Sequence, residues 1–144
     1  MIGVTRESIM SALFNKLITA TGVKTYGRKL VTWNDVPAGK QPALFMIQLH
    51  QEALYRIGMP IRWTLPIEVY LYVHSNGNHN VAPSTLLNDM LDAVEKAIAP
   101  DEGAKTQTLG GLVYQCSIQG RIETDEGVLG EQAVAIVPIE IITV

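Results

Sequence analysis

The stretch IRWTLPIEVYLYV, residues 61–73, carries an apolar residue at every odd position. Alternation with a period of two is typical of a β-strand that buries one face. The preceding run ALFMIQL, residues 43–49, is apolar on both alternating faces, which favours a central strand or one that is covered on two sides. We therefore expect these two segments to pair as an antiparallel hairpin.

Two further strands are predicted closer to the C-terminus. Apolar and polar residues alternate over residues 112–123, and residues 133–144 are largely apolar. The segment DEGVLG, residues 125–130, lies between them and is rich in turn-forming residues. Together with the first hairpin, these segments predict a mainly antiparallel sheet of four strands.

Two amphipathic helices are expected on either side of the first hairpin. Thr5 is a suitable N-cap for a helix that ends at Thr21 and Gly22, and its apolar residues recur at three- and four-residue spacing: Ile9, Met10, Leu13, Phe14, Leu17 and Ile18. The second helix begins near Pro83 and ends before Pro100, with Leu87, Met90, Leu91, Val94 and Ile98 on one face. The sequence thus predicts one α+β domain over residues 1–144, in the order α-β-β-α-β-β.

Two prolines bear on the order of the strands. Pro66 and Pro138 fall inside the second and fourth predicted strands, and proline cannot donate a hydrogen bond to a neighbouring strand. Placing both strands at the edges gives the order 2-1-3-4, which we take as the prediction. The alternative is a bulge at each proline, since a bulge can occur on any strand.

No set of residues predicts a catalytic, metal or cofactor site. The three histidines, His50, His74 and His79, do not have the spacing of zinc ligands, and Cys116 falls on the apolar face of its strand. We therefore expect a protein that is not an enzyme and needs no cofactor. The competing interpretation is an active site assembled between subunits from His50, His74 or Glu68.

Charge is distributed unevenly along the chain. Residues 1–62 hold eight basic and three acidic residues, whereas residues 63–144 hold three basic and eleven acidic ones. Opposite charges on two parts of one chain would suit a head-to-tail contact between copies. No apolar run is long enough to span a membrane and no signal-like start is present, so we expect a cytosolic protein without membrane contact.

Eight residues are the candidates for contacts with other chains. Arg28, Lys29 and Trp33 form the one basic and aromatic cluster, and an acidic pI of about 5.5 favours a protein partner for it over a nucleic acid. The remaining candidates lie next to this cluster, at the two prolines and in the predicted hairpin turn: Asp35, Pro66, Pro138, Asp125 and Glu126.

Several stretches resemble the tail terminator proteins of long-tailed bacteriophages, the minor tail protein U-like family. They are WNDVPAGKQPALF at residues 33–45, QTLGGLV at residues 107–113 and GRIETDEGVLGEQAVAIVPIEI at residues 120–141. With residues 87–99 as the intervening helix, the resemblance runs along nearly the whole chain. These motifs are structural and carry no catalytic signature.

The resemblance implies a role in the virion. Proteins of this family are small α+β domains that form a hexameric ring, cap the head-proximal end of the tail tube, stop its growth and offer a docking surface to the head. Its partners would be its own copies, the tail tube protein and a head-completion or neck protein, with genomic DNA passing through the lumen. The ring would be assembled in the cytoplasm of the host bacterium.

Three other interpretations fit the same sequence. Another head–tail connector, such as a neck or head-completion subunit, would use a similar small-domain ring. A nucleic-acid-binding module would rely on Arg28, Lys29 and Trp33, and the enzyme with an intersubunit site is described above. The long loop of residues 22–41 is expected to become ordered on assembly.

Overall fold

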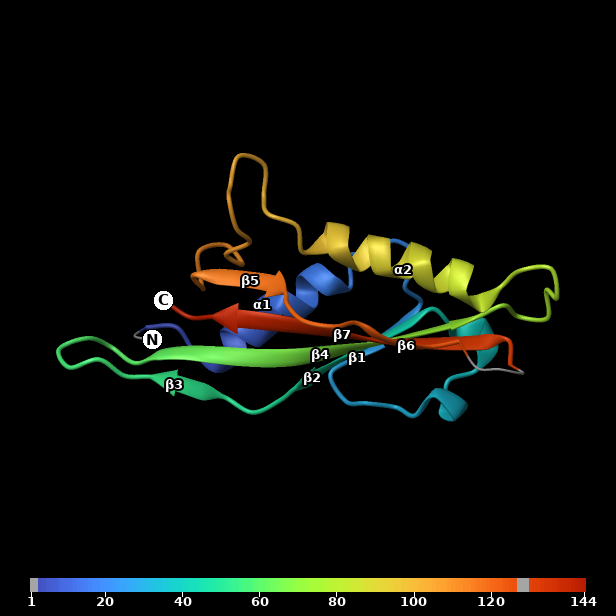
Figure 1. Cartoon of the computed structure of the whole chain (residues 1–144), viewed down its shortest axis with the longest axis horizontal. Coiled ribbons are helices and arrows are strands. Elements are labelled where there is room, and N and C mark those ends of the chain that lie inside the picture. The colour runs from blue at the N-terminus through green and yellow to red at the C-terminus, as the bar shows by residue number, and fades with distance from the viewer. Residues whose placement is uncertain (1–2, 127–129) are drawn as a thin grey trace.

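A computed structural model describes residues 3–126 and 130–144. Within these residues, two α-helices pack on one face of a mixed seven-stranded sheet (Figure 1). The α+β class and both amphipathic helices are therefore confirmed, whereas the prediction of a four-stranded antiparallel sheet is wrong.

Both helices begin at the predicted positions, and α1 ends at Leu17, before the predicted end at Thr21 and Gly22. Helix α1 spans Arg6–Leu17, and the Thr5 hydroxyl accepts a hydrogen bond of 3.1 Å from the backbone N–H of Ser8. The Ser8 side chain reaches back to the Thr5 backbone, which completes a capping box. Helix α2 spans Pro83–Ala97, with proline in its first turn, where no backbone donor is needed.

The sheet contains strands that the alternation of residues did not predict. Its main order is β1-β2-β4-β7-β5, while β3 pairs with β4 and β6 pairs with β7. The strands are β1 Thr25–Gly27, β2 Ala43–Gln48, β3 Glu52–Leu54, β4 Arg62–His74, β5 Gln115–Ile118, β6 Glu123–Asp125 and β7 Gln132–Ile142. All pairs are antiparallel except β1 with β2, which run parallel.

The predicted strand order is also wrong, because both proline-containing strands are central. β4 lies between β2 and β7, and Pro66 stands opposite the three residues that separate β2 from β3. The Pro66 carbonyl accepts a hydrogen bond of 3.1 Å from the Leu49 N–H. In an antiparallel pair the N–H and C=O of a residue point to the same neighbour, so the missing donor faces this interruption.

Pro138 occupies the corresponding position in β7. The pairing of β7 with β5 ends at Ile139, and its pairing with β6 begins at Ile136. The four residues 119–122, which connect β5 to β6, therefore face only two residues of β7, Val137 and Pro138. The Pro138 carbonyl accepts a hydrogen bond of 3.1 Å from Gln119. β4 and β7 pair with each other without a break at either proline, and the interruptions lie in their other neighbours. The interruption beside β7 divides the predicted strand 112–123 into β5 and β6.

The main core lies between the helices and the sheet. Its sheet side is formed mainly by the odd-numbered residues of β4 and β7, which are buried from Leu65 to Val73 and from Ala133 to Ile141, with Leu44 and Met46 of β2 and Cys116 of β5 beside them. The helices contribute mainly Ile9, Met10, Leu13, Leu17, Leu87, Met90 and Val94. The period of two predicted for residues 61–73 is therefore confirmed as the signal of this face, and the burial of β7 follows the same alternation.

A smaller apolar cluster covers one end of the opposite sheet face. Val36 from the loop after β1 packs with Ala43, Phe45 and Tyr72. The Tyr72 hydroxyl donates a hydrogen bond of 2.8 Å to the carbonyl of Val31, which fixes the loop to the sheet. Two 3-10 turns, Trp33–Asp35 and Ala38–Lys40, complete this segment. The ordering of residues 22–41 on assembly stays a prediction.

Candidate interaction surfaces

A hairpin of residues 52–62, which we name the arm, extends the sheet beyond its other strands. It contains β3, a connecting tip and the first residue of β4, and Figure 1 shows it projecting from one end of the molecule, near the C-terminus. Every residue of the arm is exposed. The arm therefore has no covering layer in the single chain.

Local sequence accounts for the hairpin. The Met59 N–H donates a hydrogen bond of 3.1 Å to the Arg56 carbonyl, which closes a four-residue turn. Gly58 has a φ of 81° in the third position of this turn, a left-handed conformation that glycine adopts without steric cost. Three register pairs, from Glu52–Thr64 to Leu54–Arg62, hold the base of the arm together.

Large apolar side chains of the arm face solvent. Ile57 is 91% exposed, Tyr55 65% and Met59 61%, and Leu54 and Ile61 are exposed as well. A hollow of about 180 Å³ lies between the arm and the C-terminal residue, lined by Leu54, Arg56, Met59, Pro60, Arg62 and Val144. Exposed apolar side chains gathered on one hairpin make the arm a candidate site of protein interaction, because burying them in a partner is favourable.

After Glu52, its first residue, the charged side chains of the arm are all positive. Residues 53–62 include Arg56 and Arg62 and no acidic residue. The Arg62 guanidinium lies 5.1 Å from the centre of the Tyr114 ring, where it makes a cation–π contact. The described ion pairs do not involve Arg56, which stands in the turn at the tip.

The sheet face away from the helices, which we name the open face, collects acidic residues. Residues that pair across two strands point to the same face of the sheet. In the pairs Pro66–Glu140 and Glu68–Pro138, both carboxylates therefore lie on the open face, whereas the odd-numbered residues point into the core. The β6–β7 register adds Glu123 and Asp125 to the same face. The Tyr70 hydroxyl donates a hydrogen bond of 3.0 Å to Glu68. The pKa of Tyr70 is raised mainly by its burial and, to a smaller extent, by the Glu68 carboxylate.

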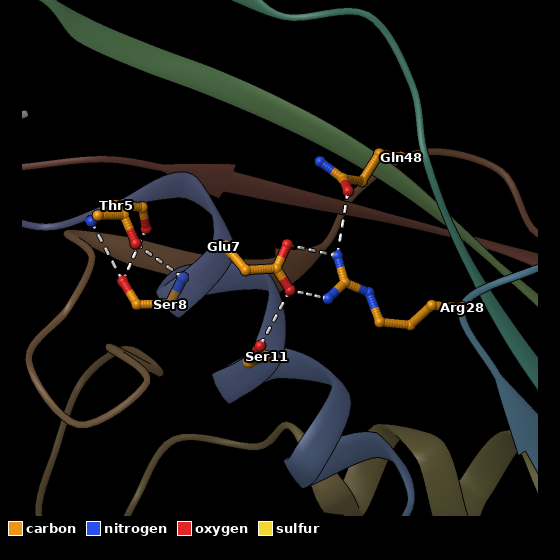
Figure 2. Close-up of polar contacts among 6 residues, drawn as sticks. All are labelled: Thr5, Glu7, Ser8, Ser11, Arg28 and Gln48. Atoms are coloured by element: carbon orange, nitrogen blue, oxygen red, sulfur yellow. Dashed lines mark hydrogen bonds and ion pairs between the residues drawn. The ribbon is translucent and has the colours of Figure 1, made fainter.

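Arg28, a candidate for partner contact, forms an ion pair and hydrogen bonds within the chain. Figure 2 shows its guanidinium between the carboxylate of Glu7 on α1 and the amide oxygen of Gln48 at the end of β2. The hydrogen bond from Arg28 lowers the pKa of Glu7, and Ser11 donates a further hydrogen bond of 3.2 Å to the same carboxylate. This cluster joins α1 to the sheet.

The neighbouring candidates lie on the surface of the loop after β1. Lys29 is exposed, and Trp33 is 41% exposed while its carbonyl accepts a hydrogen bond of 3.2 Å from the Gln132 amide. The Asp35 carboxylate accepts a hydrogen bond of 2.6 Å from the Thr32 hydroxyl. Their role in binding a partner stays a prediction.

The remaining candidates lie on or beside the open face. Pro66 and Pro138 are half-buried there, and Asp125 is exposed in β6. The Glu126 carboxylate accepts a hydrogen bond of 3.4 Å from the Ser84 N–H at the start of α2, where a negative charge is favourable. The turn predicted between β6 and β7 includes residues 127–129, which lie outside the described residues.

The arm escaped the sequence interpretation. The signal was present, because eleven residues between two predicted strands held Tyr55, Ile57 and Met59 in a segment too long for a tight hairpin. Only the structure shows that no neighbouring element covers them.

Across residues 3–126 and 130–144, no three His, Cys, Asp or Glu side chains come close enough together to hold a metal ion. Cys116 is buried, and desolvation raises the pKa of its thiol to about 12. Among the helices of the described chain, none has the length and apolar character needed to cross a membrane.

Comparison with known proteins gives matches by structure and none by sequence. The sequence matches no protein-family model, and no curated protein sequence matches it. A solved structure of the virion of a native gene transfer agent particle contains a chain with a similar fold, at a TM-score of 0.59 and 7% sequence identity. The match covers 99% of this chain and 98% of that chain, so the fold of this protein is shared from end to end with a virion chain.

Proposed function

We propose that this protein is a structural component of a virion, and specifically a tail terminator. Copies of the chain would form a hexameric ring on the head-proximal end of a phage tail tube. The ring would stop polymerisation of the tube and provide the surface on which the head or neck docks. In this role the protein acts by shape and surface chemistry and is not an enzyme.

One observation carries the proposal, namely the fold match along the full length of both chains to a protein of a virion particle. The resemblance of residues 33–45, 107–113 and 120–141 to tail terminators supports the same role and narrows it.

The surfaces of the chain fit a ring subunit. A ring of identical copies needs two different surfaces on each copy, and the apolar, basic arm and the acidic open face are two such surfaces. Tail tube protein and a head-completion or neck protein would bind the two rims of the ring. Genomic DNA would pass through the lumen without sequence-specific binding.

Tube growth provides the test of this function. The tail tube protein of the same viral genome is polymerised with and without the purified chain, and tubes are viewed by negative-stain electron microscopy. We expect a ring at one end of each tube and no further growth when fresh tube protein is added. Tubes that keep growing at both ends in excess chain would refute the terminator role.

A second candidate is another head–tail connector, such as a neck or head-completion subunit. The fold match favours it too, because a virion contains several kinds of joint and the match does not specify which one. Incubating the chain separately with tail tubes and with DNA-filled heads distinguishes the two. A terminator binds tubes in the absence of heads, whereas a head-completion subunit binds heads in the absence of tubes.

A further inference from the structure

We infer that the arm of one copy docks on the open face of a second copy of this chain. The inference rests on the proposed function, which requires copies to assemble, and it identifies the two surfaces that meet. The partner is thus a chain of the same sequence, and the contact joins two different surfaces.

Charge is the first argument. The arm brings Arg56 and Arg62, and its one acidic residue, Glu52, lies at its base opposite Thr64. The open face brings four carboxylates along three adjacent strands: Glu68, Glu140, Glu123 and Asp125. Of these, Glu123 is 3.7 Å from Arg121, an ion pair that is largely exposed. Opposite charge on the two surfaces guides association and disfavours contact of like with like.

Apolar surface is the second argument. The arm exposes Ile57, Tyr55 and Met59, which lie in or beside the turn at its tip. Between its carboxylates, the open face holds half-buried apolar side chains, namely Pro66, Ile136, Pro138 and Ile142. A charged surface that also contains an apolar strip can bury such a tip and still satisfy its arginines at the rim.

Topology makes the contact intermolecular. The arm continues β4 away from the body of the sheet, while the acidic residues lie further along the same sheet and on β6 (Figure 1). An arm that extends in the direction of its own sheet cannot fold back over that sheet without breaking the β3–β4 ladder. Contacts of this head-to-tail kind form rings when the rotation between copies closes.

A competing receptor for the arm is less complementary. A hollow of about 590 Å³ lies between the end of α2 and β5, and its apolar lining includes Ile98, Ile118 and Ile122. Its charged residues are Glu95 and Lys105, which oppose each other in sign. This hollow therefore offers the two arginines no net attraction, and the open face is the receptor we propose.

Reciprocal charge reversal tests the contact. Arg56→Glu and Glu140→Arg are made singly, and self-association is measured by sedimentation velocity from about 1 to 500 μM, a range that spans typical weak and strong contacts. Each variant alone is expected to associate at least about tenfold more weakly, since like charges then face each other at every contact. Mixing the two variants in equal amounts restores association, because each altered arm meets an altered face and each unaltered arm meets an unaltered face.

Matched variants separate this effect from a general loss of charge. Lys96→Glu and Glu95→Arg make the same changes on the exposed side of α2 and are expected to associate as the wild type does. Far-UV circular dichroism verifies the fold of each variant. If the wild type associates only on tail tubes, the same samples are compared by chemical cross-linking on tubes.

The outcomes distinguish the inference from the proposed function. Association that both single variants retain, or that their mixture fails to restore, overturns the inference and leaves the terminator role standing. A chain that associates neither alone nor on tubes overturns both. If association is weak in each single variant and returns when the two variants are mixed, the contact is supported, because misfolded chains would not regain association on mixing.

Discussion

Replacing Ile57 by alanine separates the stability of the fold from the strength of assembly. The change removes three carbons, each contributing about 0.8 kcal/mol when fully buried, or about 2.4 kcal/mol in total. Ile57 is 91% exposed, so only about a tenth of this, roughly 0.2 kcal/mol, contributes to folding. Burial of the same side chain at each contact between copies would make it worth up to about 2.4 kcal/mol there, or about 50-fold in affinity.

Two assays on the same sample measure the two quantities. Urea unfolding gives the free energy of unfolding, and sedimentation velocity gives the association constant. Leu13→Ala is the opposite control, because Leu13 is fully buried and its truncation is expected to cost about 3 to 5 kcal/mol of stability. An Ile57→Ala variant that loses more than about 1 kcal/mol of stability, or that associates as the wild type does, would refute the assignment of the arm to assembly.

Three further predictions concern the cap of α1, the buried cysteine and the ion pair of α1. Thr5→Ala removes the acceptor of the Ser8 N–H and is expected to lower the free energy of unfolding by about 1 kcal/mol, measured in urea, whereas an unchanged value would show that the cap contributes nothing. With the pKa of Cys116 raised to about 12, the native thiol is expected to resist a thiol reagent at pH 8 and to react fully once the chain is unfolded in urea; rapid native reaction would contradict its burial. Because the pKa of Glu7 is lowered below its ordinary value of 4.5 by Arg28, the stability it adds is present above that value and is lost as the pH falls through the lower folded value. The stability difference between wild type and Glu7→Gln should therefore narrow below pH 4.5, and a difference that stays constant down to pH 2 would exclude the ion pair as its source.

Local patterns were enough to predict the helices and the long strands. The three- and four-residue spacing of Leu13 and Leu17, and the alternation from Leu65 to Val73, reflect burial of one face and depend only on residues near in sequence. The strands β1, β3 and β6 have three residues each, which is too short for an alternation to be recognised. They form because the longer strands beside them offer free hydrogen-bonding groups.

Strand order and the main surfaces depend on contacts between distant segments. The edge positions predicted for the two prolines are wrong: Pro66 is central because its neighbour is interrupted where the missing donor would point. The same holds for Arg28, whose charge is paired with Glu7 in a helix 21 residues away. Neither the interruption nor the ion pair leaves a mark in the residues next to it, so sequence reasoning placed these prolines at the edges and this arginine at an interface.

The mass of the chain with and without tail tubes tests the central claim most directly. Light scattering of the purified 15.8 kDa chain is compared with its stoichiometry on tubes, where six copies would amount to about 95 kDa per tube end. The proposed function predicts a ring of this mass on one end of each tube. A stable dimer that leaves the tubes unbound would contradict it.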